Sequence, residues 1–276
     1  MTAQSAQRFG LIAGNGRLPF LVLEAARMQH IDVVVAAIKE ETFAAIEAFG
    51  YPVHWLGIGQ LGKLIRLFND SGVTKAIMAG QVKHVQIFSS ALPDLTMIRM
   101  LAGLKEKNTD ALIGGVARVL EQAGIELVDS TALLSPHMAP EGTLTRRALN
   151  PREAADVEFG RGIAHRIAQL DIGQSIVVRE RAVVAVEAME GTDAVIRRAG
   201  LLVGRKNLTV VKVSKPRQDM RFDVPVVGEE TIASMVEAGA TALVLDANRT
   251  LLVGRERLTE LADRNDIAVV ALPPIE

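Results

Sequence analysis

Alternating apolar runs and glycine-rich turns constrain the fold of this 276-residue chain more than any other feature. In the first third, apolar segments at 9–13, 33–38, 53–56 and 76–79 each end in a turn that leads into a helical pattern. Strands that alternate with helices form parallel sheets, because each crossover helix returns the chain to the same edge. The sequence therefore predicts an α/β protein whose N-terminal domain is Rossmann-like with a parallel sheet.

Two of these turns are candidates for binding a nucleotide, because open α/β sheets bind ligands at the carboxyl ends of their strands. Pro19 suits the first turn of the helix that follows the first strand, and that helix start offers free N–H groups to a phosphate. The alternative is that the glycines only make tight turns. The predicted nucleotide-binding residues are Gly14, Asn15, Gly16, Arg17, Leu18, Ala79, Gly80 and Gln81.

A third glycine-rich turn, at 57–63, has the glycine and lysine spacing of a phosphate loop but departs from the motif in two respects. Leu64 stands where such a loop needs Ser or Thr to hold magnesium, and the turn follows the third strand. These departures argue against a Walker-type ATPase and against NAD binding.

The second half of the chain predicts another α/β domain. Asn150 and Pro151 are a good N-cap and first residue for a helix over 152–169, and a hairpin is expected across residues 179–181. The predicted division is an N-terminal domain over 1–130, a linker over 131–149 and a C-terminal domain over 150–276, with a ligand cleft between the domains.

The stretch KVSKPRQDMRFDVPVVG, at 212–228, is the strongest candidate for a catalytic site. Its four cations and two acids leave a local excess of positive charge, which favours an anionic ligand, and prolines stiffen both flanks. An edge strand with a solvated polar face is the alternative. The candidate residues of this stretch are Lys212, Lys215, Gln218, Arg221 and Asp223.

A second candidate cluster, at 187–193, gathers oxygen donors between a strand and a helix. Magnesium prefers oxygen ligands and completes its shell with waters and substrate phosphates. Thr192 and Asp193 are predicted to act in catalysis, whereas Glu187 and Glu190, with Asp223, are predicted metal ligands. A helix start with acids favoured by the dipole is the alternative.

Composition excludes several classes of function. The net charge of −1 argues against a nucleic-acid-binding protein, and the absence of cysteine excludes disulfides and thiolate chemistry. The N-terminus lacks the pattern of a secretory signal, and the apolar runs fall short of the ~20 residues that span a bilayer. We expect a cytoplasmic protein with at most peripheral contact with the inner membrane.

Taken in order, the motifs resemble the UDP-2,3-diacylglucosamine pyrophosphatases of the lipid A pathway, in the family that is not calcineurin-like. The resemblance covers the whole chain and rests on six segments. They are GLIAGNGRLP, GIGQLGK, AGQV, LDIGQSIVV, VEAMEGTD and KVSKPRQDMRFDVPVVG.

The resemblance implies a two-domain, magnesium-dependent enzyme, expected as a homodimer, that hydrolyses the diphosphate of a lipid-linked nucleotide sugar. Its products would be UMP and 2,3-diacylglucosamine 1-phosphate, and the aspartate matching Asp223 would be needed for catalysis, as metal ligand or as base. By their chemistry, Lys212, Lys215 and Arg221 would neutralise phosphate oxygens and Gln218 would orient water or sugar. The N-terminal domain would hold the uridine nucleotide, and the C-terminal catalytic domain would close over the diphosphate and hold the lipid. A nucleotide-sugar transferase and a non-catalytic UDP-sugar-binding regulator are the alternatives.

Overall fold

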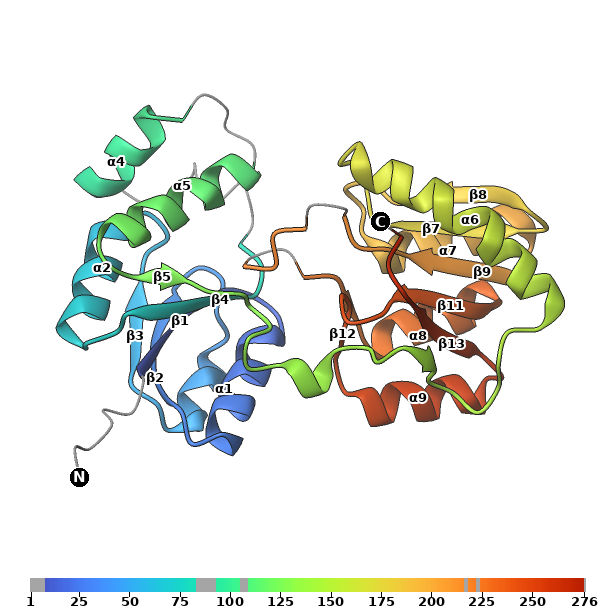
Figure 1. Ribbon diagram of the computed structural model, residues 1–276, viewed down its shortest axis with the longest axis horizontal. Coiled ribbons are helices and arrows are strands. Elements are labelled where there is room, and N and C mark those ends of the chain that lie inside the picture. The colour runs from blue at the N-terminus through green and yellow to red at the C-terminus, as the bar shows by residue number, and fades with distance from the viewer. Residues whose placement is uncertain (1–7, 83–92, 105–108, 216–217, 222–223, 276) are drawn as a thin grey trace. The chain divides into compact units, whose positions relative to one another are not determined.

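The computed structural model describes residues 8–82, 93–104, 109–215, 218–221 and 224–275, and the chain divides into two units. Unit 1 comprises residues 1–134 and 220–222, and unit 2 comprises residues 135–219 and 223–276. Each unit is built around its own sheet (Figure 1). Residues 135–149, part of the predicted linker, group with unit 2 and contain a short 3-10 helix and strand β6.

Unit 1 contains a parallel sheet with the strand order β3-β2-β1-β4-β5, as the alternating pattern predicts. Strand β2 reads DVVVAAI and is buried from its second residue to its last, which is typical of strands covered on both faces. The strands are β1 (Arg8–Ala13), β2 (Asp32–Ile38), β3 (Val53–Leu56), β4 (Lys75–Ala79) and β5 (Glu126–Leu127).

Helices cover both faces of this sheet, with α1 and α5 on opposite sides (Figure 1). The helices are α1 (Leu18–Met28), α2 (Leu61–Asp70), α4 (Leu95–Ala102) and α5 (Thr109–Gln122). Between β2 and β3, where a helical pattern is expected, the chain forms a 3-10 helix, η1 (Ala44–Phe49). On the face covered by α2, α4 and α5, the fully buried ring of Phe68 packs against Gly10, where a Cβ would lie 2.7 Å from the ring.

Unit 2 contains a six-stranded mixed sheet with the order β6-β13-β11-β9-β7-β8. Strands β9, β11 and β13 are parallel, and β7 and β8 form the predicted antiparallel hairpin. Glu180 and Arg181 turn the hairpin with φ values of 51° and 56°, which suits a tight two-residue turn. The strands are β6 (Gly142–Thr143), β7 (Ser175–Arg179), β8 (Ala182–Val186), β9 (Leu208–Lys212), β11 (Ala240–Asp246) and β13 (Ala268–Leu272). Strands β10 (Val226–Val227) and β12 (Leu251–Leu252) pair separately.

Four helices flank the second sheet, and they are α6 (Pro151–Gln169), α7 (Thr192–Val203), α8 (Glu229–Ala238) and α9 (Arg255–Arg264). Helix α6 packs Ala164 and Ala168 on Ile176 and Val211 of one face, whereas α7, α8 and α9 bury the largest apolar cluster on the other. Asn150 caps α6 as predicted: its side chain accepts from the Glu153 N–H, and the Glu153 carboxylate accepts from the Asn150 N–H.

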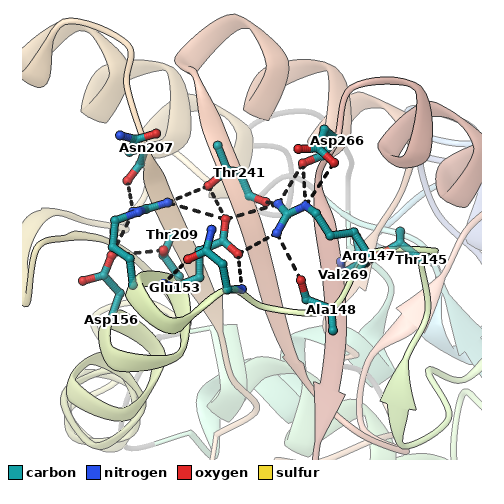
Figure 2. Close-up of polar contacts among 12 residues, drawn as sticks. Thr145, Arg147, Ala148, Glu153, Asp156, Asn207, Thr209, Thr241, Asp266 and Val269 are labelled. Carbon is teal, nitrogen blue, oxygen red and sulfur yellow. Dashed lines mark hydrogen bonds and ion pairs between the residues drawn. The ribbon is translucent and has the colours of Figure 1, made fainter.

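A buried ion network holds the first turn of α6 against the amino ends of the strands (Figure 2). The fully buried Glu153 carboxylate accepts from both terminal nitrogens of Arg147, at 2.7 and 3.2 Å, and from the Thr241 hydroxyl at 2.6 Å. Arg152 donates to Asp156, which also accepts from the Thr209 hydroxyl. This network lies at the edge of the sheet opposite to the carboxyl ends of β9 and β11, so we assign it a structural role.

Candidate functional site

The two predicted nucleotide-binding turns lie side by side in unit 1, because β1 and β4 are neighbours in the sheet. The Gly14 N–H donates to the Ala79 carbonyl at 2.8 Å. Asn15 and Gln81 exchange a pair of backbone hydrogen bonds, at 2.7 and 3.0 Å. The turns therefore form one surface at the carboxyl edge of the parallel sheet.

Glycine occurs at positions 14, 16 and 80 of these turns for different structural reasons. A Cβ on Gly14 would lie 2.5 Å from the Gln81 carbonyl oxygen, and one on Gly80 would lie 2.4 Å from that of Asn15. Both positions therefore require glycine for the contact between the turns, whatever ligand binds. Gly16 has a φ of 93° and no atom within 4 Å of its Cβ direction, so its backbone faces open space.

The predicted anion site lies at the start of α1. Arg17 is the N-cap residue, it is exposed, and no side chain caps the helix. Leu18 begins the helix, and Pro19 follows in its first turn. The positive end of the helix dipole and the Arg17 guanidinium both favour a negative group here.

Two acidic residues after β2 belong to the same region, and the sequence prediction missed both. The Asn15 side-chain amide donates to Glu41 at 3.3 Å. One carboxylate oxygen of Glu40 is buried with no hydrogen-bond partner among the residues that the structure describes. An acid near the end of the second strand binds ribose hydroxyls in doubly wound dinucleotide-binding folds, so its position after β2 was the available signal.

Two candidate catalytic residues of unit 2, Lys212 and Thr192, meet at the carboxyl end of β9. Lys212, at 6% exposure, donates from Nζ to the Thr192 hydroxyl at 2.6 Å and to the Ser175 hydroxyl at 3.5 Å. Thr192 in turn donates to Glu187 at 2.9 Å. The structure thus joins the two stretches that the sequence singled out, and adds Ser175, which lies opposite Lys212 in the sheet.

Close backbone packing fixes Glu187 in this cluster. A Cβ on Gly173 would lie 2.0 Å from the Glu187 carbonyl oxygen, so only glycine fits there. The adjacent Gln174 N–H donates to the Glu187 carboxylate at 3.3 Å. This contact explains the glycine of the LDIGQS segment, which links the turn before β7 to the end of β8.

The start of the 212–228 stretch is anchored by Asp246 at the end of β11. One Asp246 oxygen accepts from the Ser214 N–H at 2.8 Å and from the Ser214 hydroxyl at 3.0 Å. Its other oxygen accepts from Arg161 of α6 at 3.1 Å. Burial lowers the pKa of the nearby His165 imidazole, Asp246 opposes this shift and Arg161 adds to it. Asp246, which the sequence prediction missed, holds the backbone and the hydroxyl of Ser214 in place.

The next residues of the stretch have local partners. Lys215 forms an ion pair with Asp171 at 2.5 Å, and the Gln218 amide oxygen accepts from the Lys215 N–H at 2.6 Å. The Arg221 carbonyl accepts from the hydroxyl of the buried Ser130 at 2.6 Å, within unit 1. The backbone at Arg221 is thereby held beside the end of β4, where the Ser130 hydroxyl also lies 2.5 Å from the Met78 carbonyl.

The two predicted metal ligands that the structure describes have separate partners: Glu187 accepts from Thr192, and Glu190 pairs with Arg198. Glu190 forms an ion pair with Arg198 at 2.6 Å. The pKa of Glu190 is lowered by its own backbone N–H, by Arg198 and by the Ala188 N–H. Asp193 has one buried oxygen without a hydrogen-bond partner among the described residues. Asp223 lies outside the described residues, and within them no group of three or more His, Asp or Glu side chains could hold a metal ion.

Comparison with known protein families shows which family the chain belongs to. Residues 8–137 match the LpxI N-terminal domain, and residues 140–270 match the LpxI C-terminal domain. The chain belongs to the LpxI family. The family resemblance predicted from the six motifs is therefore confirmed, as is the two-domain α/β architecture.

A relative within the LpxI family is similar over almost the whole chain. It is the UDP-2,3-diacylglucosamine pyrophosphatase LpxI of Caulobacter vibrioides, with 33% identity over 280 residues, covering 98% of this chain and 99% of the relative. No described helix of the LpxI-family chain is long and apolar enough to cross a membrane.

Solved structures give only weak likenesses. A nucleoside-diphosphate-sugar epimerase from Pseudomonas aeruginosa has a TM-score of 0.28 at 11% identity, covering 43% of this chain and 30% of that chain. The biotin carboxylase domain of the Hydrogenobacter thermophilus 2-oxoglutarate carboxylase has a TM-score of 0.26 at 14% identity, covering 61% and 34%. Neither score supports an inference about fold or function.

Proposed function

We propose that this LpxI-family chain hydrolyses the diphosphate of UDP-2,3-diacylglucosamine to UMP and 2,3-diacylglucosamine 1-phosphate. The full-length similarity to a pyrophosphatase of that name supports the reaction. The observation that carries the proposal is the buried Lys212 ammonium, which Thr192 and Ser175 hold at the end of β9. A fixed cation in a site of low dielectric suits a diphosphate, whose charge it stabilises with little reorganisation.

In the reaction, water adds to one phosphorus, the bridging P–O bond breaks, and the leaving phosphate takes the electron pair. Lys212 would stabilise charge on the phosphoryl oxygens, and Thr192 with Glu187 would keep its ammonium in place. Asp223 would either ligate a metal or take the proton of the attacking water. The hydrogen bonds from Ser214 to Asp246 hold the start of the segment that precedes Asp223 in place.

Magnesium dependence is part of the proposal, on chemical grounds. Magnesium commonly binds one or two protein carboxylates and completes its shell with waters and phosphates. The carboxylates of Glu187 and Glu190 already accept hydrogen bonds from Thr192 and Arg198, so they fit a metal poorly. We therefore propose Asp223 and the diphosphate as the oxygen donors; bound there, the metal would polarise a phosphoryl oxygen. A homodimer in the cytoplasm, with at most peripheral membrane contact, also stays a prediction.

Release of UMP tests the proposal. The protein should release UMP from UDP-2,3-diacylglucosamine with magnesium, and EDTA should stop the release. Lys212→Met should lower kcat by about 10²-fold or more, as expected for the loss of one charge-stabilising donor. The matched control is Lys206→Met, on an exposed residue before β9. Equal rates for the two variants would contradict the assignment, and consumption only in the presence of an acceptor alcohol would indicate a transferase.

A further inference from the structure

A side chain replaces a backbone donor just after β5, which lies beside β4 in the parallel sheet of unit 1 (Figure 1). The Val128 N–H donates to the Ala76 carbonyl at 2.9 Å, and the hydrogen bonds of a parallel pair are evenly spaced. Two residues further along both segments, the next acceptor is the Met78 carbonyl. There the donor is the Ser130 hydroxyl, at 2.5 Å.

The Ser130 N–H is therefore available to a different segment, and it donates to the Met220 carbonyl at 2.8 Å. The hydroxyl oxygen also lies 2.6 Å from the Arg221 carbonyl, so its one proton is shared between that oxygen and the Met78 carbonyl. Ser130 is 1% exposed, so water does not compete for these contacts. One buried serine thus holds two consecutive carbonyls of the 212–228 stretch.

These contacts lie on the part of the stretch that belongs to unit 1, residues 220–222. The chain returns to unit 2 at residue 223, and there the Pro225 carbonyl accepts from the Leu251 N–H at 2.8 Å. In sequence, Asp223 stands midway between the two held carbonyls of Arg221 and Pro225. Asp223 itself lies outside the described residues.

The other neighbour of β4 carries a predicted nucleotide-binding turn. Consecutive carbonyls of a central strand point to opposite neighbours. The Met78 carbonyl points to Ser130, and the next carbonyl, of Ala79, accepts from the Gly14 N–H at 2.8 Å. Adjacent residues of β4 therefore bind the turn and the serine that holds Arg221.

A purely structural end to β5 does not need this arrangement. The Ser130 N–H could continue the ladder to Met78, as the Val128 N–H does to Ala76, and almost any residue could supply that N–H. We propose that Ser130 is a positioning residue for the reaction. It fixes the backbone of Arg221, so that the guanidinium meets the phosphate oxygens from a preset position. This role rests on the proposed function, in which Arg221 neutralises phosphate oxygens.

Two variants and a matched control test the proposal. Ser130→Ala removes the hydroxyl, whereas Ser130→Thr keeps it. The control is Ser234→Ala, whose fully buried hydroxyl donates to the Glu230 carbonyl within α8 at 2.8 Å. Far-UV circular dichroism establishes that each variant is folded. One arm measures kcat and KM for UMP release. The other measures the rate of trypsin cleavage after Arg221 by mass spectrometry, which reports release of the held backbone.

We expect Ser130→Ala to lower kcat about tenfold and to change KM less than about twofold, because the positioned cation acts on charge that develops in the transition state. Trypsin should cleave after Arg221 about tenfold faster in this variant, since the loss of a buried hydrogen bond favours local opening. Ser130→Thr should stay within about threefold of the parent in both arms, because the donor is kept. Ser234→Ala should match the parent in both arms.

A folded Ser130→Ala variant that trypsin cleaves at the parent rate would overturn the proposal. Faster cleavage with an unchanged kcat, or an equal loss of kcat in Ser234→Ala or in Ser130→Thr, would overturn the positioning role. If the parent releases no UMP, the proposed function fails and the role in the reaction fails with it. The cleavage arm then decides by itself whether Ser130 holds the backbone of Arg221.

Discussion

Replacing Glu153 by glutamine should strongly destabilise unit 2. The carboxylate is fully buried at the first turn of α6, and it accepts from Arg147, Thr241 and the Asn150 N–H (Figure 2). Glutamine keeps the shape but turns one oxygen into a donor. That donor would face the Arg147 guanidinium, whose remaining charge partner would be the exposed Asp266.

The structure sets the expected magnitude. Removing one partner of a buried ion pair costs about 3–5 kcal/mol. The Arg147 side chain is 25% exposed, so water compensates part of the loss, and we expect about 3 kcal/mol. With a urea m-value of about 1–3 kcal/mol/M, the unfolding midpoint of unit 2 should fall by about 1–3 M.

The aromatic residues of the chain allow the two units to be followed separately. The sequence contains 1 Trp and 1 Tyr, and both Trp55 and Tyr51 lie in unit 1. Tryptophan fluorescence therefore reports unit 1, whereas far-UV circular dichroism reports both units. Glu153→Gln should shift a circular dichroism transition and leave the Trp55 transition in place. The matched control is Glu256→Gln, on an exposed acid in the first turn of α9, which should cost less than about 1 kcal/mol.

The pH dependence of the stability independently tests whether the ionised Glu153 carboxylate stabilises unit 2. Burial alone would raise the pKa of the Glu153 carboxyl, but hydrogen bonds from Arg147, Thr241 and the Asn150 backbone, with the charge of Arg147, lower it overall. A group whose folded pKa is lowered contributes stability above its unfolded pKa of about 4.3 and loses it as the pH falls through the folded value. The difference between parent and Glu153→Gln should thus be largest near pH 7 and shrink below about pH 4. Equal midpoints for Glu153→Gln and Glu256→Gln at pH 7 would refute this reasoning.

Two further predictions concern the candidate site. Gly173→Ala should lower the stability by about 1–3 kcal/mol in urea unfolding and lower kcat, because its Cβ would lie 2.0 Å from the Glu187 carbonyl oxygen. The matched control is Gly162→Ala, at an exposed position of α6 with free space around it, which should raise the stability by about 0.5–1 kcal/mol. A Gly173→Ala variant as stable and active as the parent would contradict the contact. In the UMP assay, Asp246→Asn should lower kcat more than it changes KM, because the substitution weakens the hold on Ser214 and Asp246 does not contact the substrate. A change in KM alone would argue against this positioning role.

Local signals in the sequence predicted much of the fold. The helix cap at Asn150, the hairpin turn at Glu180 and the strand–turn–helix unit around Gly14 follow from short patterns, and the structure contains all three. The helical pattern after the second strand formed a 3-10 helix of 6 residues, because composition alone does not separate a short α-helix from a 3-10 helix.

The parts of the site that escaped prediction depend on distant contacts. The reason for glycine at position 80 is the carbonyl of Asn15, which no local pattern reveals. Asp246 is the last residue of an apolar strand, and its contact with Ser214 appears only when β9 and β11 pair. Glu190 was grouped with the metal ligands because an acid before a helix is ambiguous, and its partner Arg198 lies two turns into α7.

The most direct test of the central claim is UMP release from UDP-2,3-diacylglucosamine by the parent, Asp223→Asn and the control Asp70→Asn, whose exposed acid ends α2. With magnesium, we predict that the parent and Asp70→Asn release UMP at the same rate and that Asp223→Asn is slower by about 10²-fold or more, the usual contribution of a positioned acid or base. Metal binding retained by Asp223→Asn would favour the base role, and its loss would favour the ligand role. An Asp223→Asn variant as fast as the parent, or a parent that releases no UMP, would contradict the proposed function.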